Sequence, residues 1–152
     1  MASPQQIGHM AAALDEARAA AARGEVPVGA VVSGPDGRVL AHAGNRTREL
    51  NDPTAHAEIL AIRAACAALG SERLVDCDLT VTLEPCPMCA TAISFARIRR
   101  LYFGANDPKG GGVEAGPRIF NQPTCHHVPE VYGGISESAA SALLVSFFAS
   151  RR

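Results

Sequence analysis

Two short segments contain one histidine, one glutamate and two cysteines at a spacing that suits a zinc centre. They read His56-Ala57-Glu58 and Pro85-Cys86-Pro87-Met88-Cys89. Zinc sites built from histidine and cysteine often have three protein ligands and leave the fourth position open for water. We therefore predict that His56, Cys86 and Cys89 bind one Zn²⁺. Glu58 is then not needed as a ligand and is free to transfer protons.

Other interpretations of these residues stay open. The zinc could be structural, with Glu58 or a distant cysteine or histidine as its fourth ligand, or the segments could bind no metal. Cys125-His126-His127 could also ligate an ion. Neighbouring side chains of an extended segment point to opposite faces, so we expect this segment to pack instead. Cys66 is expected in the core, and Cys77 is left undecided.

Each half of the motif is predicted to lie at the start of a helix. Asp52-Pro53-Thr54 provides cap residues and a proline suited to a first turn. Pro87 marks the first turn of a second helix, which runs through Phe95. Side chains lean towards a helix N-terminus, where the dipole favours thiolates. The first helix is expected to continue to Gly70 with this apolar stripe: Ile59, Ile62, Cys66 and Leu69.

Helices and strands are predicted to alternate along the rest of the chain. A helix from Ser3-Pro4 to near Gly24 has a stripe of Ile7, Met10, Ala11, Leu14, Ala17, Arg18 and Ala21. Strands are expected at 26–32 and 38–43, as a hairpin, and at 79–83, 100–104 and 128–132, the last an edge strand because of Pro129. Ser136 is expected to cap a final helix with apolar Ala140, Leu143, Leu144, Phe147 and Phe148. This order predicts an α/β fold with a largely parallel sheet covered on both faces.

The glycine-rich segment Lys109 to Pro117 does not follow the strand-to-helix pattern of a phosphate-binding loop. We expect it to form a mobile rim of the site.

The amino-acid composition limits the classes of protein to which the chain can belong. The 152 residues are 47% hydrophobic, which fits one folded domain over residues 1–152. A net charge of −1 argues against a general nucleic-acid binder but allows a local basic rim. Several arginines are expected near the site or the chain end: Arg46, Arg48, Arg97, Arg99, Arg100, Arg151 and Arg152.

Cysteine usage and the chain start indicate the compartment. Five cysteines, two of them assigned to metal, fit a reducing environment better than a disulfide framework. The start lacks the regions of a signal peptide, and no run of about eighteen apolar residues occurs. We expect a cytoplasmic protein without a membrane span.

The sequence resembles the bacterial tRNA-specific adenosine deaminases of the cytidine-deaminase-like superfamily. The segments that carry the resemblance are 25–30, 44–46, 52–58, 82–89, 97–98, 103–105 and Asp107. The paired zinc motifs are shared by many nucleobase deaminases. Asp52 to Glu58 together with Gly44-Asn45-Arg46 is more selective for the tRNA enzymes. Residues 108–122 depart from the family, because they are richer in glycine and poorer in leucine.

The resemblance implies a three-layer α/β/α sandwich with a central mixed sheet, a homodimer, and deamination of adenosine to inosine at wobble position 34 of tRNA. It implies one zinc per subunit, held by His56, Cys86 and Cys89. Glu58 would move protons between water, adenine N1 and the departing ammonia.

The resemblance also implies substrate contacts. Asn45 matches a base-contacting asparagine, although a turn residue after a strand is the other interpretation. Further positions expected on the substrate side are Ala57, Asp107, Phe147 and Phe148, with core packing an equal explanation for at least one phenylalanine. Arg46 and the Arg151-Arg152 tail are expected to contact phosphates of a tRNA anticodon stem-loop.

Two functions of other kinds stay open at this point. A small-molecule deaminase acting on free cytosine, guanine or a nucleoside would share the same zinc chemistry. A catalytically idle, zinc-stabilised module is disfavoured by Glu58, which such a module does not need.

Overall fold

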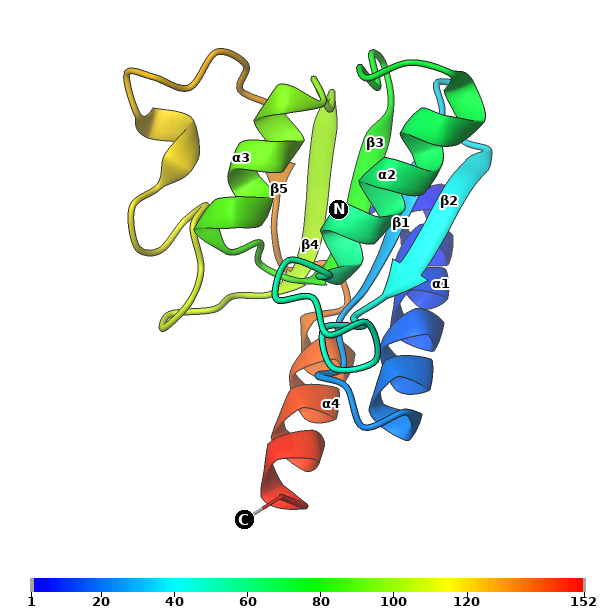
Figure 1. Cartoon of the computed structure of the whole chain (residues 1–152), viewed down its shortest axis with the longest axis vertical. Coiled ribbons are helices and arrows are strands. Elements are labelled where there is room, and N and C mark those ends of the chain that lie inside the picture. The colour runs from blue at the N-terminus through cyan, green and yellow to red at the C-terminus, as the bar shows by residue number, and fades with distance from the viewer. Residues whose placement is uncertain (1, 152) are drawn as a thin grey trace.

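The computed structural model describes residues 2–151, which form a five-stranded sheet between two layers of helices (Figure 1). The strands lie in the order β2-β1-β3-β4-β5. Their bounds are β1 Gly29–Ser33, β2 Val39–Gly44, β3 Asp78–Leu83, β4 Arg100–Ala105 and β5 Glu130–Tyr132. The short strand β5 forms one edge, as Pro129 predicts.

The sheet is mixed. The order of helices and strands had predicted a largely parallel sheet, and that prediction was wrong. The mixed sheet that the family resemblance implies is confirmed. The strand pairs β3–β4 and β4–β5 are parallel, but β1 is antiparallel to both β2 and β3. The reason is topological. The predicted hairpin places β2 at the edge, and the connection through the following helix crosses over β1, so that β1 lies between two strands of the opposite direction.

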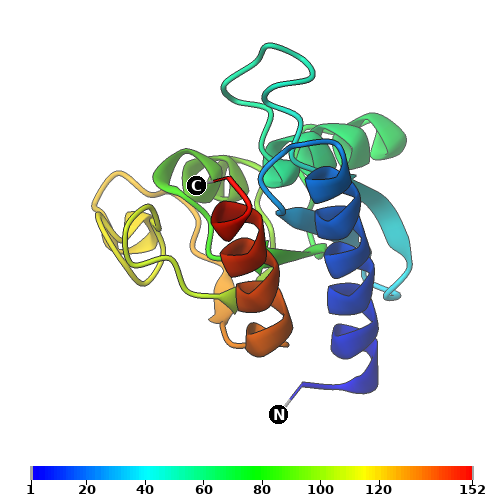
Figure 2. The same ribbon diagram turned by 90° about the horizontal axis from the view of Figure 1, so that it is seen from below.

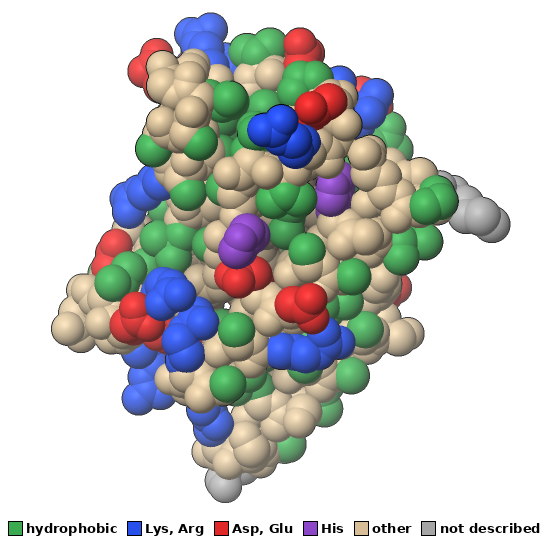
Figure 3. Space-filling view, turned by 90° about the vertical axis from the view of Figure 1, so that its right-hand side faces the viewer, with side chains coloured by type: hydrophobic (Ala, Val, Ile, Leu, Met, Phe, Trp, Pro, Cys, Tyr) green, Lys and Arg blue, Asp and Glu red, His purple; other side chains and the backbone are tan. Residues whose placement is uncertain are grey.

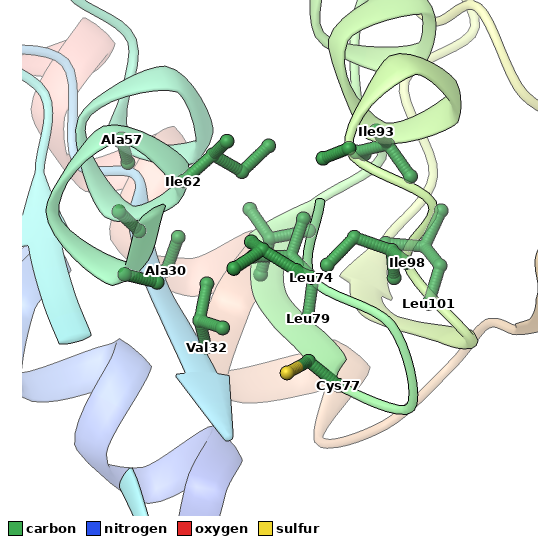
Figure 4. Packing of buried hydrophobic residues seen from close by; sticks show 14 of the residues in the cluster. Ala30, Val32, Ala57, Ile62, Leu74, Cys77, Leu79, Ile93, Ile98 and Leu101 are labelled. Carbon is green, nitrogen blue, oxygen red and sulfur yellow. The ribbon is translucent and has the colours of Figure 1, made fainter. Parts of the chain in front are cut away.

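The helices cover both faces of the sheet. Helices α1 (Pro4–Ala22) and α4 (Glu137–Ala149) lie side by side on one face (Figure 2). Helices α2 (Ala57–Leu69) and α3 (Pro87–Phe95) lie on the other, with the 3₁₀ helix η1 (Ile119–Asn121) next to α3. Each face has its own hydrophobic core, and the larger one, between the sheet and α2 and α3, is shown in Figure 4. The α/β/α sandwich is therefore confirmed.

Two predicted helix starts differ in detail. Helix α2 begins after His56, because Asp52 accepts hydrogen bonds from the Thr54 N–H and hydroxyl (2.9 and 2.7 Å) and forms a separate turn. Ser136 occupies the N-cap of α4 as predicted, but it has φ 54° and its side chain makes no capping hydrogen bond.

The buried faces of the first two helices are built mainly from small residues rather than from the largest apolar ones. The buried side chains of α1 are Met10, Ala13, Leu14, Ala17 and Ala20, while Ile7 and Arg18 are exposed. Those of α2 are Ala57, Glu58, Ala61, Ile62 and Ala65, while Leu69 is exposed. Alanines let a helix approach the sheet closely, which periodicity of large residues does not reveal. Within residues 2–151 no helix has the length and hydrophobicity to cross a membrane.

Candidate zinc centre and base cavity

The three predicted ligands come together at the spacing of a tetrahedral zinc site. His56 Nδ1 lies 3.7 Å from Cys86 Sγ and 3.5 Å from Cys89 Sγ. Zn–S bonds of about 2.3 Å and Zn–N bonds of about 2.0–2.1 Å at a tetrahedral angle require an S···N separation of about 3.6 Å. All three ligand atoms lie within 4.8 Å of one another. The residues present therefore fit a zinc ion with one open coordination position.

Two helix starts create this geometry. His56 is the N-cap of α2 and Cys86 the N-cap of α3, and both have extended backbone angles without a side-chain cap. Pro87, at the first position of α3, needs no N–H acceptor there. Cys89, one turn along, is fully buried. The helix dipoles and free N–H groups of both starts favour anionic ligands at their meeting point.

The close approach of the three ligand side chains also shifts their pKa values. A hydrogen bond with Cys89 lowers the pKa of Cys86 to about 4, while the same interaction raises the pKa of Cys89. A hydrogen bond with Cys86 raises the pKa of His56. A bound divalent cation favours thiolate at both cysteines, because a coordinating thiol is deprotonated.

Glu58 lies beside the ligands and is 4% exposed. Burial raises its pKa to about 7. It is the second residue of α2, so its carboxyl reaches the same helix end as His56. Glu58 is therefore placed near the ligands, in a setting that suits proton transfer.

A cavity of about 230 Å³ opens beside these groups. This is below the roughly 300–1,000 Å³ of pockets for drug-sized ligands and suits a single base. The residues that line it are Val26, Val28, Asn45, His56, Glu58, Leu83, Glu84, Cys86, Asp107 and Gly110. Two predicted substrate positions, Asn45 and Asp107, thus meet Glu58 at one cavity. Larger cavities lie away from the ligands, among them one of about 520 Å³ between α2 and α3 and one of about 850 Å³ beside β5.

Other predicted substrate positions lie outside the cavity lining. Ala57 is fully buried at the start of α2. Phe147 is buried on α4, with the Arg151 guanidinium 3.8 Å above its ring, whereas Phe148 is half exposed. Arg46 binds Glu49 through two contacts of 2.7 Å. Arg152 lies outside the described residues.

The predicted arginines separate into two regions. Arg46 and Arg48 lie in the segment that follows Asn45. Arg99 and Arg100 lie at the other end of β4 from the ligands, where they pair with Asp78 and Glu130. Arg97 hydrogen bonds to the Ser94 carbonyl near the same end. On the face in Figure 3, basic side chains are interspersed with acidic ones and form no continuous patch. Arg46 and Arg48, which follow the cavity residue Asn45 in the chain, are therefore the candidates for a basic rim.

The Cys125-His126-His127 segment packs as expected and joins no metal cluster among the described residues. His127 Nε2 is 2.7 Å from the Ile98 carbonyl oxygen, and Ser94 Oγ donates to the His127 carbonyl at 2.8 Å. Cys66 packs against the core and Cys77 is buried in it.

Sequence reasoning missed two buried glutamates that hold the loops around the cavity. Glu25 accepts hydrogen bonds from the backbone of Arg48 and Glu49 (3.2 and 2.8 Å). Glu84 accepts five hydrogen bonds from the loop after β4. Burial raises the pKa of Glu84, but the backbone N–H groups outweigh it and hold the pKa below its ordinary value. An acidic residue between the end of an apolar strand and a proline is the signal that could have revealed Glu84. The glycine-rich segment is thus anchored, with Gly111 to Val113 buried, and not the free rim that we expected.

Comparisons with known proteins agree with this geometry. Residues 3–105 match the cytidine and deoxycytidylate deaminase zinc-binding region. A tRNA-specific adenosine deaminase of Agrobacterium fabrum is 66% identical over 94% of this chain and 93% of its own. One of Bacillus subtilis is 41% identical over 92% of this chain and 86% of its own.

Solved structures share the fold. One, from a study of A-to-I editing by tRNA:A34 deaminases at the wobble position, is 66% identical with a TM-score of 0.89, over 90% of this chain and 99% of that chain. Guanine deaminase from Bacillus subtilis is 31% identical with a TM-score of 0.64, over 95% of this chain and 92% of that chain. The ligand geometry and these likenesses lead to one conclusion: the chain belongs to the tRNA-specific adenosine deaminases, within the family defined by the cytidine and deoxycytidylate deaminase zinc-binding region.

Proposed function

We propose that this chain deaminates adenosine to inosine at the wobble position of tRNA by zinc-dependent hydrolysis. The observation that carries the proposal is the convergence of His56, Cys86 and Cys89 at tetrahedral spacing beside buried Glu58, in a cavity that suits one base. The 66% identity to a tRNA-specific adenosine deaminase supports tRNA as the substrate.

Glu58 carries the proton transfers of the reaction. Zinc held by His56, Cys86 and Cys89 would lower the pKa of a water molecule towards neutrality. Glu58 takes a proton from the water molecule while the water oxygen bonds to adenine C6. Glu58 then passes that proton to N1 of the adenine. Glu58 then takes the proton of the new C6 hydroxyl and gives it to N6 as the C6–N6 bond breaks. N6 leaves as ammonia, C6 keeps a carbonyl oxygen, and the products are inosine and ammonia. Burial of Glu58 keeps these transfers away from bulk solvent.

The cavity walls recognise the base. The Asn45 amide can both donate to and accept from a purine edge, and Asp107 faces the same cavity. Ala57 is fully buried between His56 and Glu58 at the start of α2, behind the cavity wall, and holds these two residues next to the base. Phe148 is half exposed at the end of α4 and offers ring surface on which an unpaired loop base can stack, and buried Phe147 supports it edge to face.

Phosphate contacts come from the basic rim. Arg23 and Arg46 both pair with Glu49, at 3.7 and 2.7 Å. Arg23 and Arg46 therefore share one carboxylate, and Arg48 lies beside them, where its Nη1 donates to the Gly24 carbonyl. A splayed anticodon loop needs few such contacts, which is compatible with the net charge of −1.

The groove between α2 and α3 forms a homodimer interface. It is lined by Ile59, Phe95 and other apolar residues with both signs of charge at its rim, from Arg63, Glu72 and Arg97. Phe95 is 65% exposed, which favours burial against a second copy. Light scattering should show a dimer for the wild type and a monomer for Phe95→Ser, with exposed Val145→Ser as the matched control. A dimeric Phe95→Ser would exclude this face.

The chain acts in the cytoplasm. All five cysteines are free thiols, and two of them are placed as zinc ligands. Thiols of this kind persist in a reducing compartment.

One assay tests the activity. Zinc-loaded protein is incubated with an anticodon stem-loop that has adenosine at position 34, and separately with free adenine, guanine and cytosine. We expect inosine in the stem-loop and no ammonia from free bases. Guanine deaminases share this fold, so release of ammonia from guanine with an unmodified stem-loop would replace the tRNA substrate by a free base.

A further inference from the structure

Glu84 is a buried acidic side chain between β3 and the cysteine segment, and it is 2% exposed. No Lys or Arg side chain pairs with it among residues 2–151. Its partners are instead N–H groups of the loop that follows β4. Oε1 accepts from Asp107 N (3.0 Å) and Asn106 Nδ2 (3.2 Å), and Oε2 from Val113 N (3.2 Å), Glu114 N (2.9 Å) and Ala115 N (3.0 Å). One carboxylate thus fixes both ends of the segment 106–115.

The middle of this segment rests on the same part of the chain. A Cβ at Gly111 would lie 2.5 Å from Glu84 Oε2, and one at Gly112 would lie 2.6 Å from Pro87 N. Gly112 N also donates to the Pro85 carbonyl at 2.8 Å. The segment therefore lies directly on residues 84–87, at a distance that only glycine allows.

The segment forms a wall of the base cavity. Asp107 and Gly110 line the same cavity as His56 and Glu58. Asp107 Oδ1 accepts from Gly110 N at 3.0 Å, which joins the two lining residues. Glu84 is two residues before Cys86, so one short segment carries both a metal ligand and the anchor of the wall.

We propose that Glu84 is a positioning residue for the substrate: its carboxylate sets the distance between the Asp107 wall and the zinc ligands, and thereby the fit of the base. This rests on the proposed assignment of the cavity to the target base. Glu84 lies in the cavity lining, but both of its carboxylate oxygens are taken up by the five loop donors, so its loss affects substrate fit before metal retention. Misplacing a binding group by about 1 Å can reduce turnover by about a hundredfold.

The test is Glu84→Gln, which keeps the shape but turns one acceptor into an amide donor facing N–H groups. We expect one zinc per chain, a KM for the stem-loop raised about tenfold or more, and faster hydrogen exchange at the amides of 113–115. The matched control is Glu114→Gln, an exposed glutamate on the same segment, which should match the wild type.

The outcomes separate this inference from the proposed function. A wild-type protein inactive on the stem-loop would overturn the assignment of substrate. An active wild type together with a Glu84→Gln variant of unchanged KM, or one whose activity falls only in proportion to lost zinc, would overturn the role of Glu84. If Glu84→Gln does not fold, Asn106→Ala is the variant that tests the role of Glu84. It removes one of the five hydrogen bonds and keeps the Glu84 carboxylate. It should raise KM in the same direction by a smaller factor, and an unchanged KM would overturn the proposal.

Discussion

Replacing Gly112 by alanine tests whether the glycine-rich segment and the cysteine segment are packed as one unit. The added methyl would lie 2.6 Å from Pro87 N, 2.7 Å from Pro87 Cα and 2.9 Å from the Cys86 carbonyl carbon. Favourable contacts between such atoms lie at about 3.5–4.0 Å, so the two segments must separate by about 1 Å. All three atoms belong to the backbone, and no side-chain rotation relieves the overlap.

Overpacking of this kind typically costs about 1–3 kcal/mol. For a chain of this size, each kcal/mol lowers Tm by about 2–4 °C, so we expect a fall of about 2–12 °C at a fixed zinc concentration. Metal–ligand distances tolerate changes of only about 0.2 Å. Displacement of the Cys86 backbone should therefore also weaken zinc binding. Tm is measured by calorimetry and zinc affinity by competition with a chelator.

Gly8→Ala is the matched control. Gly8 lies within α1, and a Cβ there would meet nothing within 4 Å. Alanine is favoured over glycine in a helix interior by roughly 0.5–1 kcal/mol, so the same substitution should here raise Tm. A Gly112→Ala protein with the Tm and zinc affinity of the wild type would refute the close packing.

Four further predictions concern the site. Cys86→Ala and Cys89→Ala should each lose zinc and activity together, as measured by metal analysis and the stem-loop assay; full zinc in either variant would contradict the ligand set. Glu58→Ala should retain zinc and lose turnover by about a hundredfold to ten-thousandfold, whereas stoichiometric loss of zinc would make Glu58 the fourth ligand. Asn45→Ala should mainly reduce turnover of the bound stem-loop, and loss of binding alone would argue against its role at the base. Arg46→Ala should weaken stem-loop binding and flatten its dependence on salt by about one unit of slope, with zinc content unchanged; a slope equal to that of the wild type would remove Arg46 from the phosphate contacts.

The sequence by itself determined the ligand set and the local elements that present it. Ligand chemistry depends on residue type, and His56, Cys86 and Cys89 have the types and order that a zinc site requires. Pro87 predicted the start of α3 because proline suits a first helical turn. The helix start depends on residues near one another in the chain. His56 and Cys86 are 30 residues apart, and their assignment to one ion depends on residue type and order alone.

Only the tertiary structure decided how distant segments meet. The antiparallel position of β1 between β2 and β3 depends on the path of the crossover, which periodicity does not encode. Glu84 was hidden for the same reason, since its five donors lie between residues 106 and 115 and are mostly backbone groups without a sequence signature. Asn45 and Asp107 come to one cavity through sheet order. Residue type specifies which chemistry is available, whereas the packing of backbone against backbone sets the distances at which that chemistry acts.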